Sequence, residues 1–360
     1  MSVPRRALSG LILATLVTAV VTARQQRGLD FGASAFEGYI ELLRQTAGIP
    51  GLSGVLIQDG SIVWERGLGF ADVEARIPAR PDTPYVIGDL TEPFTAVLVL
   101  QCYERRQLSL DREITNYGGA VPNDRATVRQ VLSHTSDWRE TPPGNFKYEP
   151  ARYAQLTGVV EYCSRQTFRK SMALDVLDRL AMARSVPGRD FATAGVVPAD
   201  VLEKPYFDHY RRILESLAVP YKVDKKLHPT RTELAPEGIN AATGLVSTVR
   251  DLAQFDFALD DGTLLRDTTL AAAWSAASGP GGTPQPTGLG WFVQNYRGVP
   301  LVWQYGMVPN AYSGIVLKIP SRRVTMILLA NSDGLVNSSQ LEAGDVTRSP
   351  FASVLLRMLL

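Results

Sequence analysis

The sequence predicts β-strands at both ends of the chain and helices between them, and this order restricts the fold more than any other feature. Residues 52–58 and 62–68 are apolar segments joined by Asp59-Gly60, which is a strong hairpin signal. Strand character returns after Gly238, and four antiparallel strands are expected at residues 290–296, 301–305, 312–319 and 324–330. Strands from both ends can share one sheet only if the middle helices form an insertion, so we expect an α+β fold.

Helical periodicity accounts for most of the remaining chain. Apolar residues recur at helical spacing over residues 36–46, and residues 91–106 form a long helix with a nearly continuous apolar stretch. A final helix is expected over residues 350–360. We interpret residues 30–360 as a single domain, with its sheet part at about 30–105 and 235–360 and an inserted helical subdomain at about 106–234.

The first residues have the pattern of an export signal. Arg5 and Arg6 precede an apolar run over residues 7–21, and small residues stand before a cleavage point after Ala23. The run is shorter than the roughly 20 residues that span a bilayer, so a retained anchor is the weaker alternative. We therefore expect residues 1–23 to be a signal peptide, no membrane span after its removal, and a secreted or periplasmic protein.

Composition excludes several classes of partner and cofactor. Lys+Arg 37 against Asp+Glu 36 leaves a formal net charge of +1, which gives no basic field for nucleic acid. The three histidines are far apart in sequence, and no HExxH or CxxC pair occurs, so we expect no metal site. No phosphate-binding loop or complete dinucleotide fingerprint is present, so no cofactor is predicted.

The two cysteines leave two alternatives open. An exported protein meets oxidising conditions, in which Cys102 and Cys163 can form a disulfide. Both cysteines lie in apolar, helix-like segments, and two buried free thiols are at least as consistent with that setting.

The sequence resembles the serine β-lactamase-related family, which includes class C β-lactamases, D-alanyl-D-alanine carboxypeptidases and certain esterases. The segment GIPGLSGVLIQDGSIVWERGLGF, starting at Gly48, looks like the opening of that family, and VRQVLSHTSDW from Val128 continues the similarity. Further similar segments follow in the family's order at residues 142–156, 177–185, 238–255, 287–293 and 302–334. The resemblance implies a β-lactamase/transpeptidase-like fold, with an antiparallel sheet flanked by helices.

The motifs that carry the family's chemistry are altered in this chain. The resemblance implies acyl transfer through Ser-x-x-Lys, a Tyr-x-Asn motif and a strand motif Lys-Thr-Gly or His-x-Gly. Asp89 stands at the serine position and Glu92 at the lysine position, and no Ser-x-x-Lys occurs anywhere in the sequence. Tyr148 keeps the tyrosine of the second motif, but Pro150 replaces its asparagine. Gln304-Tyr305-Gly306 keeps only the glycine of the third motif.

Two interpretations of Asp89 and Glu92 were weighed. An acid with a second acid three residues on is the pattern of a capping box at a helix start, and Pro93 fits a first helical turn. Alternatively, two nearby carboxyl groups share a proton and act as an acid/base pair. We favour the helix cap, because a hydroxyl nucleophile and its basic partner are both missing.

The other candidate residues also have a structural and a functional interpretation. Without cationic neighbours Tyr148 keeps a high pKa, which favours packing over a role as general base. Gln304 and Tyr305 line a pocket or are sheet surface, and Gly306 admits a close backbone or is a bulge. His134 is expected to be a buried, hydrogen-bonded loop residue. Two candidate replacement nucleophiles, Ser53 and Ser136, are interpreted as structural.

The substitutions predict a change in what the pocket binds. Relative to a family member with both lysines, Asp89, Glu92 and Gln304 change the pocket charge by roughly four units if both acids are ionised. A pocket that attracts a substrate carboxylate would then repel it. Backbone N–H groups of Asp89 and Met307 match the family's oxyanion hole. We expect a small neutral or cationic ligand, or a pocket filled by an arginine such as Arg139 or Arg152.

Together these observations predict an envelope protein of the family that is catalytically inactive and acts in ligand binding or as a scaffold. The positional equivalents of the catalytic residues are Asp89, Glu92 and Tyr148. The predicted ligand-binding positions are Pro150, Gln304, Tyr305, Gly306 and Met307. The alternative is an active hydrolase of esters, β-lactams or peptides that uses non-standard residues.

Overall fold

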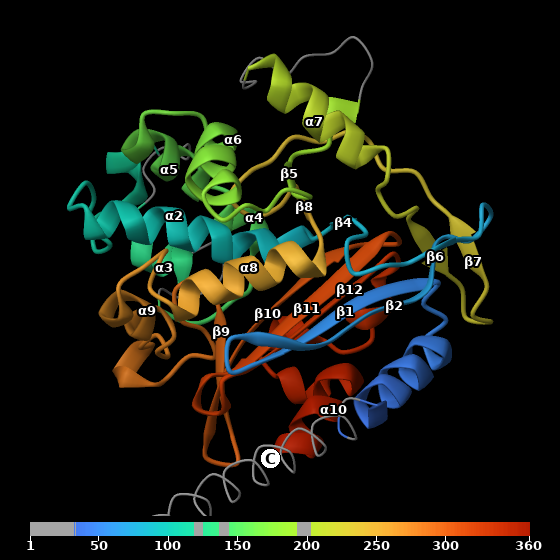
Figure 1. Ribbon diagram of the computed structural model, residues 1–360. Helices are drawn as coiled ribbons and strands as arrows, with labels where there is room; N and C mark the ends of the chain where they lie inside the picture. The colour runs from blue at the N-terminus through green and yellow to red at the C-terminus, as the bar shows by residue number, and fades with distance from the viewer. Residues whose placement is uncertain (1–31, 33, 119–124, 137–143, 193–202) are drawn as a thin grey trace, which may run out of the picture.

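The fold is built on an antiparallel sheet that joins the two ends of the chain (Figure 1). The computed structural model describes residues 32, 34–118, 125–136, 144–192 and 203–360. The seven strands have the order β3-β2-β1-β12-β11-β10-β9. Their bounds are β1 Gly51–Gln58, β2 Ser61–Asp72, β3 Ile77–Pro78, β9 Phe292–Tyr296, β10 Val299–Val308, β11 Tyr312–Ile319 and β12 Val324–Ala330. Strands β1 and β12 are neighbours, paired from Leu52 with Ala330 to Gln58 with Val324, so the predicted α+β class is confirmed.

Helices and two smaller sheets complete the described chain. The helices are α2 Glu92–Glu104, α3 Val128–Leu132, α4 Pro150–Tyr153, α5 Leu156–Ser164, α6 Phe168–Ser171, α7 Lys204–Leu214, α8 Val249–Asp260, α9 Asp267–Ala273 and α10 Pro350–Leu359. A further helix covers residues 34–46. The smaller sheets are β4 Tyr85–Val86, β8 Leu245–Ser247 and β5 Val186–Pro187, and the pair β6 Tyr221–Val223 and β7 Pro229–Arg231.

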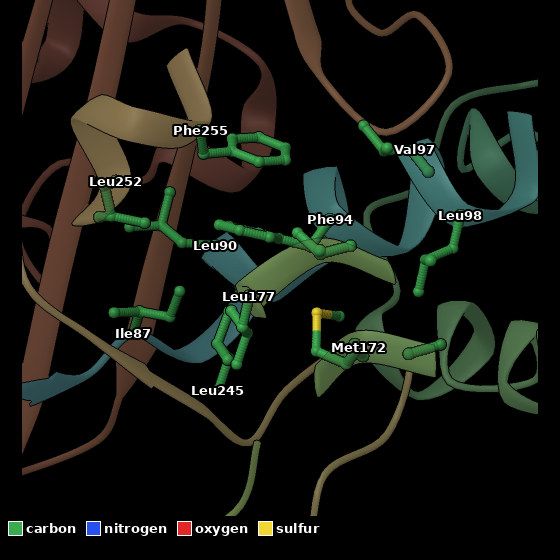
Figure 2. Close-up of a cluster of buried hydrophobic side chains, with 14 of the residues drawn as sticks. Ile87, Leu90, Phe94, Val97, Leu98, Met172, Leu177, Leu245, Leu252 and Phe255 are labelled. Atoms are coloured by element: carbon green, nitrogen blue, oxygen red, sulfur yellow. The ribbon is translucent and has the colours of Figure 1, made fainter. Parts of the chain in front are cut away.

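Helices cover both faces of the large sheet. Helices α2 and α8 lie over one face, and α10 and the helix of residues 34–46 lie over the other (Figure 1). Figure 2 shows the core on the first side, where Phe94 of α2 stacks on Phe255 of α8 with ring centroids 3.9 Å apart. Because α2 is buried on all sides over most of its length, its apolar stretch is continuous rather than striped.

Local sequence signals explain the strand boundaries. Asp59 and Gly60 both have positive φ, 50° and 75°, as a two-residue hairpin turn requires. The strands expected at residues 312–319 and 324–330 occur with those bounds. The strand predicted at residues 62–68 is longer than expected and runs from Ser61 to Asp72, because β3 pairs with its far end.

The two cysteines are bonded to each other. Cys102 near the end of α2 and Cys163 near the end of α5 form a disulfide across 61 residues of sequence. The alternative of two buried free thiols is therefore wrong. The disulfide requires α2 and α5 to pack side by side, and the apolar sequence around each cysteine does not predict that contact.

Removal of this disulfide is expected to lower the free energy of unfolding by about 2–4 kcal/mol, because the bond closes a long loop in the unfolded chain. Urea denaturation of Cys102→Ala/Cys163→Ala checks this value against the oxidised protein. The reduced unsubstituted protein is the control and should match the double variant. Equal stability of oxidised and reduced protein contradicts the prediction.

The first residues bear on export and membrane attachment. In the described part of the chain, no helix has both the length and the apolar character needed to cross a membrane. The predicted signal peptide, residues 1–23, lies outside the described residues. Its cleavage remains a prediction.

Candidate functional site

The candidate site lies where the start of α2 meets strand β10. A 3-10 turn, Gly88–Thr91, precedes α2 and packs against the strand. Gly306 of β10 is required there, because a Cβ at this position would overlap the main-chain oxygen of Ile87. Gly88 has a φ of +56°, and a Cβ on it would lie 2.8 Å from the main-chain nitrogen of Met307. Of the two interpretations of Gly306, the close backbone approach is therefore correct.

The edge of β10 at this point is open toward the turn. Strand β9 pairs with β10 only as far as Trp303, so Tyr305 and Met307 lie beyond it. The Tyr305 N–H points to this edge, where it donates to the Gln304 side-chain oxygen at 2.9 Å. In an antiparallel ladder, N–H groups two residues apart face the same edge, so the Met307 N–H faces the turn that carries Asp89. Their use as an oxyanion hole remains a prediction.

Glu92 is the centre of the site. Its side chain is fully buried, and Oε2 accepts hydrogen bonds from Gln304 Nε2 at 2.9 Å and from His134 Nε2 at 3.2 Å. The Tyr148 hydroxyl lies 3.5 Å from the same oxygen. The hydroxyl of Tyr153 donates to the main-chain oxygen of Glu92 at 3.1 Å. The group at the family's lysine position is thus an acceptor held by several donors.

His134 is a fixed, neutral donor to Glu92. Its Nδ1 accepts the main-chain N–H of Glu149 at 3.3 Å, so the ring proton is on Nε2, which faces Glu92. Burial lowers the pKa of His134 to about 3, against a smaller opposite effect of the Glu149 charge. The predicted buried, hydrogen-bonded loop residue is confirmed, and its φ of 50° marks a left-handed turn.

The prediction of a capping box at Asp89 and Glu92 is wrong. The 3-10 turn delays the start of α2, so its N-cap is Thr91, whose side chain caps no N–H and donates to the oxygen of Gly88 instead. Glu92 is itself the first helical residue, and its side chain turns inward to Gln304. Pro93 does lie in the first helical turn, as predicted.

Burial controls the charge of the two acids. It raises the pKa of Glu92 well above its usual value, although hydrogen bonds from Tyr148 and Gln304 act in the opposite direction. The pKa of Asp89 is raised by burial and then by the nearby Glu92. Glu92 is completely enclosed and Asp89 is partly exposed, and the pKa of both carboxyl groups is raised. Raised pKa values favour the neutral form of both acids, so the change in pocket charge is smaller than the four units expected for ionised acids.

One oxygen of Glu92 supports the neutral form. Among the described residues, Oε1 has no hydrogen-bond partner. An ionised oxygen left in this state costs far more than a neutral carboxyl group, because nothing replaces its hydration. Burial thus favours the neutral form of this carboxyl group, against the donors that hold Oε2.

Tyr148 belongs to an aromatic wall beside the acids. Its ring centroid lies 5.4 Å from that of Tyr305 and 5.3 Å from that of Phe292. Burial, followed by the charges of Asp89 and Glu92, raises the pKa of Tyr148 well above its usual value. A tyrosine in this setting is a hydrogen-bond donor and a packing residue, which agrees with the interpretation that we favoured.

The hydroxyl groups of the two candidate replacement nucleophiles, Ser53 and Ser136, are held in hydrogen bonds that do not involve Glu92. Ser53 Oγ is hydrogen-bonded to the oxygen of Arg80 at 2.7 Å and to the hydroxyl of Tyr85 at 2.8 Å. Ser136 Oγ accepts from Arg152 Nε at 3.1 Å. Neither contact supplies a base to the hydroxyl, so the structural interpretation of both serines is supported.

The remaining predicted positions differ in their relation to the site. Arg152 is buried and bonds Ser136, and no arginine is among the charges that shift the pKa of either acid in the described chain. Arg139 lies outside the described residues. Pro150 begins α4, so it directs the helix that brings Tyr153 to Glu92. The described residues hold no cluster of three or more His, Cys, Asp or Glu that could bind a metal ion.

Sequence reasoning missed two contacts of the site. His134 and Tyr153 both bond Glu92, 42 and 61 residues earlier in the chain. Their residue types carried no periodic or motif signal for this contact. Only the packing of the helical segments against α2 brings them together.

Comparison with known proteins identifies the family. The sequence profile described as Beta-lactamase matches residues 36–346, which is most of the chain. The chain belongs to the β-lactamase family. The curated serine beta-lactamase-like protein LACTB, mitochondrial, of Homo sapiens is 32% identical over 117 residues, 30% of this chain and 21% of that protein. Protein flp of Staphylococcus aureus strain N315 is 30% identical over 100 residues, 26% of this chain and 20% of that protein. The matched part spans about a fifth of the length of these relatives.

Solved structures confirm the fold of this β-lactamase family member. The octameric penicillin-binding protein homologue from Pyrococcus abyssi has a TM-score of 0.71 and 24% identity, covering 90% of this chain and 77% of that one. A penicillin-binding protein from Bacillus halodurans has a TM-score of 0.64 and 20% identity, covering 81% of this chain and 94% of that one. At these identities the likeness concerns the fold alone.

Proposed function

We propose that this protein is a non-acylating member of the β-lactamase family that acts in ligand binding or as a scaffold in the cell envelope. The observation that carries the proposal is the state of Glu92, a buried carboxyl group held by Gln304 and His134 at the family's lysine position. The residue at the serine position, Asp89, has no hydroxyl to be activated. A hydroxyl nucleophile and its base are therefore missing together.

The magnitude of this loss favours inactivity. Removing the nucleophile or its base from a coupled catalytic set typically lowers turnover by on the order of 10⁴–10⁶. The binding scaffold does not depend on those side chains. The open edge at Met307 and the aromatic wall of Tyr148 and Tyr305 remain available to hold a ligand.

Charge indicates the class of ligand. Asp89 is partly exposed, and no cation among the described residues is a cause of its pKa shift. An ionised Asp89 would repel a ligand carboxylate and favour a neutral or cationic group. Aromatic rings beside it also favour a cation.

A matched series of dipeptides tests the charge preference. Isothermal titration would compare N-acetyl-D-Ala-D-Ala, its neutral amide, and D-Ala-D-Ala amide with a free ammonium group. We expect the neutral and cationic compounds to bind more tightly than the carboxylate, and Asp89→Asn to reduce the differences. Tightest binding of the carboxylate, or an unchanged order in Asp89→Asn, contradicts the electrostatic part of the proposal.

The disulfide and the first residues of the chain both support an envelope location. The disulfide between Cys102 and Cys163 is typical of oxidising compartments, and the pattern of residues 1–23 is typical of an export signal.

The alternative function is a hydrolase of esters, β-lactams or peptides that uses Asp89 and Glu92 as an acid/base pair. It is favoured only by the mutual effect of these acids on the pKa of Asp89.

A further inference from the structure

A groove lies between the two helices that cover the outer face of the sheet. It runs between the helix of residues 34–46 and α10, which lie near each other in Figure 1, and has a volume of about 560 Å³. The two helices share one core, in which Phe36 and Ile40 are buried with Phe351 and Leu355. The groove is therefore a fixed surface feature formed by both helices.

The rim of this groove is apolar and exposed. Tyr39 is 56% exposed, Leu42 is 58% exposed and Met358 is 39% exposed, and all three line the groove. Single exposed apolar residues are common on protein surfaces, but a contiguous group of this kind marks an interaction site.

The charge of the groove is of one sign. Arg348 and Arg357 line it and are exposed, and no acidic side chain is among its described lining residues. Glu41, on the same helix as Tyr39, is directed to Arg44, with its Oε2 2.7 Å from Arg44 Nε. The surface thus combines apolar side chains with two exposed arginines, of which Arg348 also donates to Gln340 Oε1 at 2.7 Å and lies close enough to Asp345 to lower the pKa of that acid.

We propose that this groove face binds the surface of an anionic lipid bilayer. Arginines flanking exposed apolar side chains match lipid phosphates above an acyl region. A second copy of the chain fits less well, because a twofold contact would bring arginines together with no acid in the groove to pair them. This inference is independent of the function proposed for the Glu92 site.

The sequence before the groove agrees with this orientation. The apolar run of residues 7–21 is separated from the helix that begins at residue 34 by the twelve residues 22–33. Twelve residues reach at most about 40 Å, so only a chain that kept this run as an anchor, the weaker of the two alternatives above, would hold this face near the same membrane. After cleavage, the groove itself would give weak, reversible and salt-sensitive binding.

Vesicle flotation tests the proposal with the purified full protein, whether or not its N-terminal segment has been cleaved in the cell. The measured quantity is the gain in binding from phosphatidylcholine vesicles to vesicles that also contain phosphatidylglycerol. This gain does not depend on whether an apolar N-terminal segment is retained. Each arginine near an anionic surface is expected to contribute about fivefold.

Matched variants separate the groove from general charge and general hydrophobicity. Arg348→Gln/Arg357→Gln should reduce the anionic gain by about 25-fold, whereas the exposed control pair Arg112→Gln/Arg322→Gln should leave it unchanged. Leu42→Gln should weaken binding severalfold, and Ile77→Gln, 54% exposed on β3, should not.

Three results would overturn the proposal. In the first, the groove variants bind vesicles as well as the unsubstituted protein does. In the second, the control pair loses as much of the binding gained with phosphatidylglycerol as the groove pair does. In the third, phosphatidylglycerol does not increase binding at all. A concentration-dependent dimer in sedimentation that Leu42→Gln abolishes would assign the groove to a second copy instead.

Discussion

Glu92→Lys, which restores the family's residue, is expected to lower the free energy of unfolding by on the order of 5 kcal/mol. The side chain is fully buried, and two donors, Gln304 Nε2 and His134 Nε2, point at it. An ammonium group there would be a buried charge facing donors rather than acceptors. Glu92→Gln keeps the shape and a neutral group, so its cost should stay at or below about 1 kcal/mol.

The same pair of variants gives a pH test. Glu92 has a higher pKa in the folded protein than its ordinary value of 4.5, so the folded state binds more protons. The free energy of unfolding therefore falls as the pH rises from about 4.5 toward the raised value. Glu92→Gln removes this fall, so the variant gains stability relative to the unsubstituted protein with rising pH.

His134, which contacts Glu92, has the opposite pH dependence. Its folded pKa of about 3 lies below the ordinary 6.5, so its contribution to stability is lost as the pH falls through that interval. Because His134 contacts Glu92 directly, this loss differs between the two proteins, so the comparison is decided above pH 6.5, where His134 is neutral in the folded and the unfolded state. Urea denaturation at several pH values between 5 and 8 measures the difference. A pH-independent difference would show that Glu92 is ionised in the fold.

Lys318→Met is expected to cost about 3–5 kcal/mol at neutral pH, because it leaves a buried carboxylate without its partner. Lys318 of β11 is buried, and its Nζ lies 2.9 Å from Asp256 Oδ1 and 2.8 Å from Asp260 Oδ2, both on α8. Burial raises the pKa of Asp256 even against the opposing charge of Lys318. The cost should therefore be smaller near pH 5, where Asp256 takes up a proton more readily.

A double variant and an exposed control sharpen this experiment. Lys318→Met/Asp256→Leu removes both buried charges and should recover most of the lost stability. Lys222→Met, at an exposed position on β6, should change stability by less than about 0.5 kcal/mol. A double variant as unstable as the single one contradicts the assignment. The ion pair also shows that this buried lysine is held by two acids and is not a relocated base.

The sequence predicted the elements whose signals are local. Apolar runs ending at turn residues marked β11 and β12 with their bounds, and Asp59-Gly60 marked the first hairpin. Helix α2 begins later than the capping pattern at Asp89 predicted. That pattern is a local signal, whereas the 3-10 turn before the helix depends on packing against Gly306, which is far away in sequence. Tertiary packing overrode the cap preference there.

The composition of the candidate site was predictable only in part. Alignment to the family's motifs pointed to Asp89, Glu92, Tyr148 and Gln304, and the last three meet through Glu92 Oε2. The donor role of His134 depends on a tautomer set by Glu149, and no sequence pattern encodes that contact. The neutral state of Glu92 likewise follows from burial, which a motif does not report.

No residue of this site is expected to form an acyl intermediate. Intact mass spectrometry after incubation with a penicillin and with a chromogenic ester measures this directly, with ester turnover followed in the same samples. We expect an unchanged protein mass and the same background turnover in Asp89→Ala as in the unsubstituted protein. A stable acyl adduct, or turnover that disappears in Asp89→Ala, would contradict it.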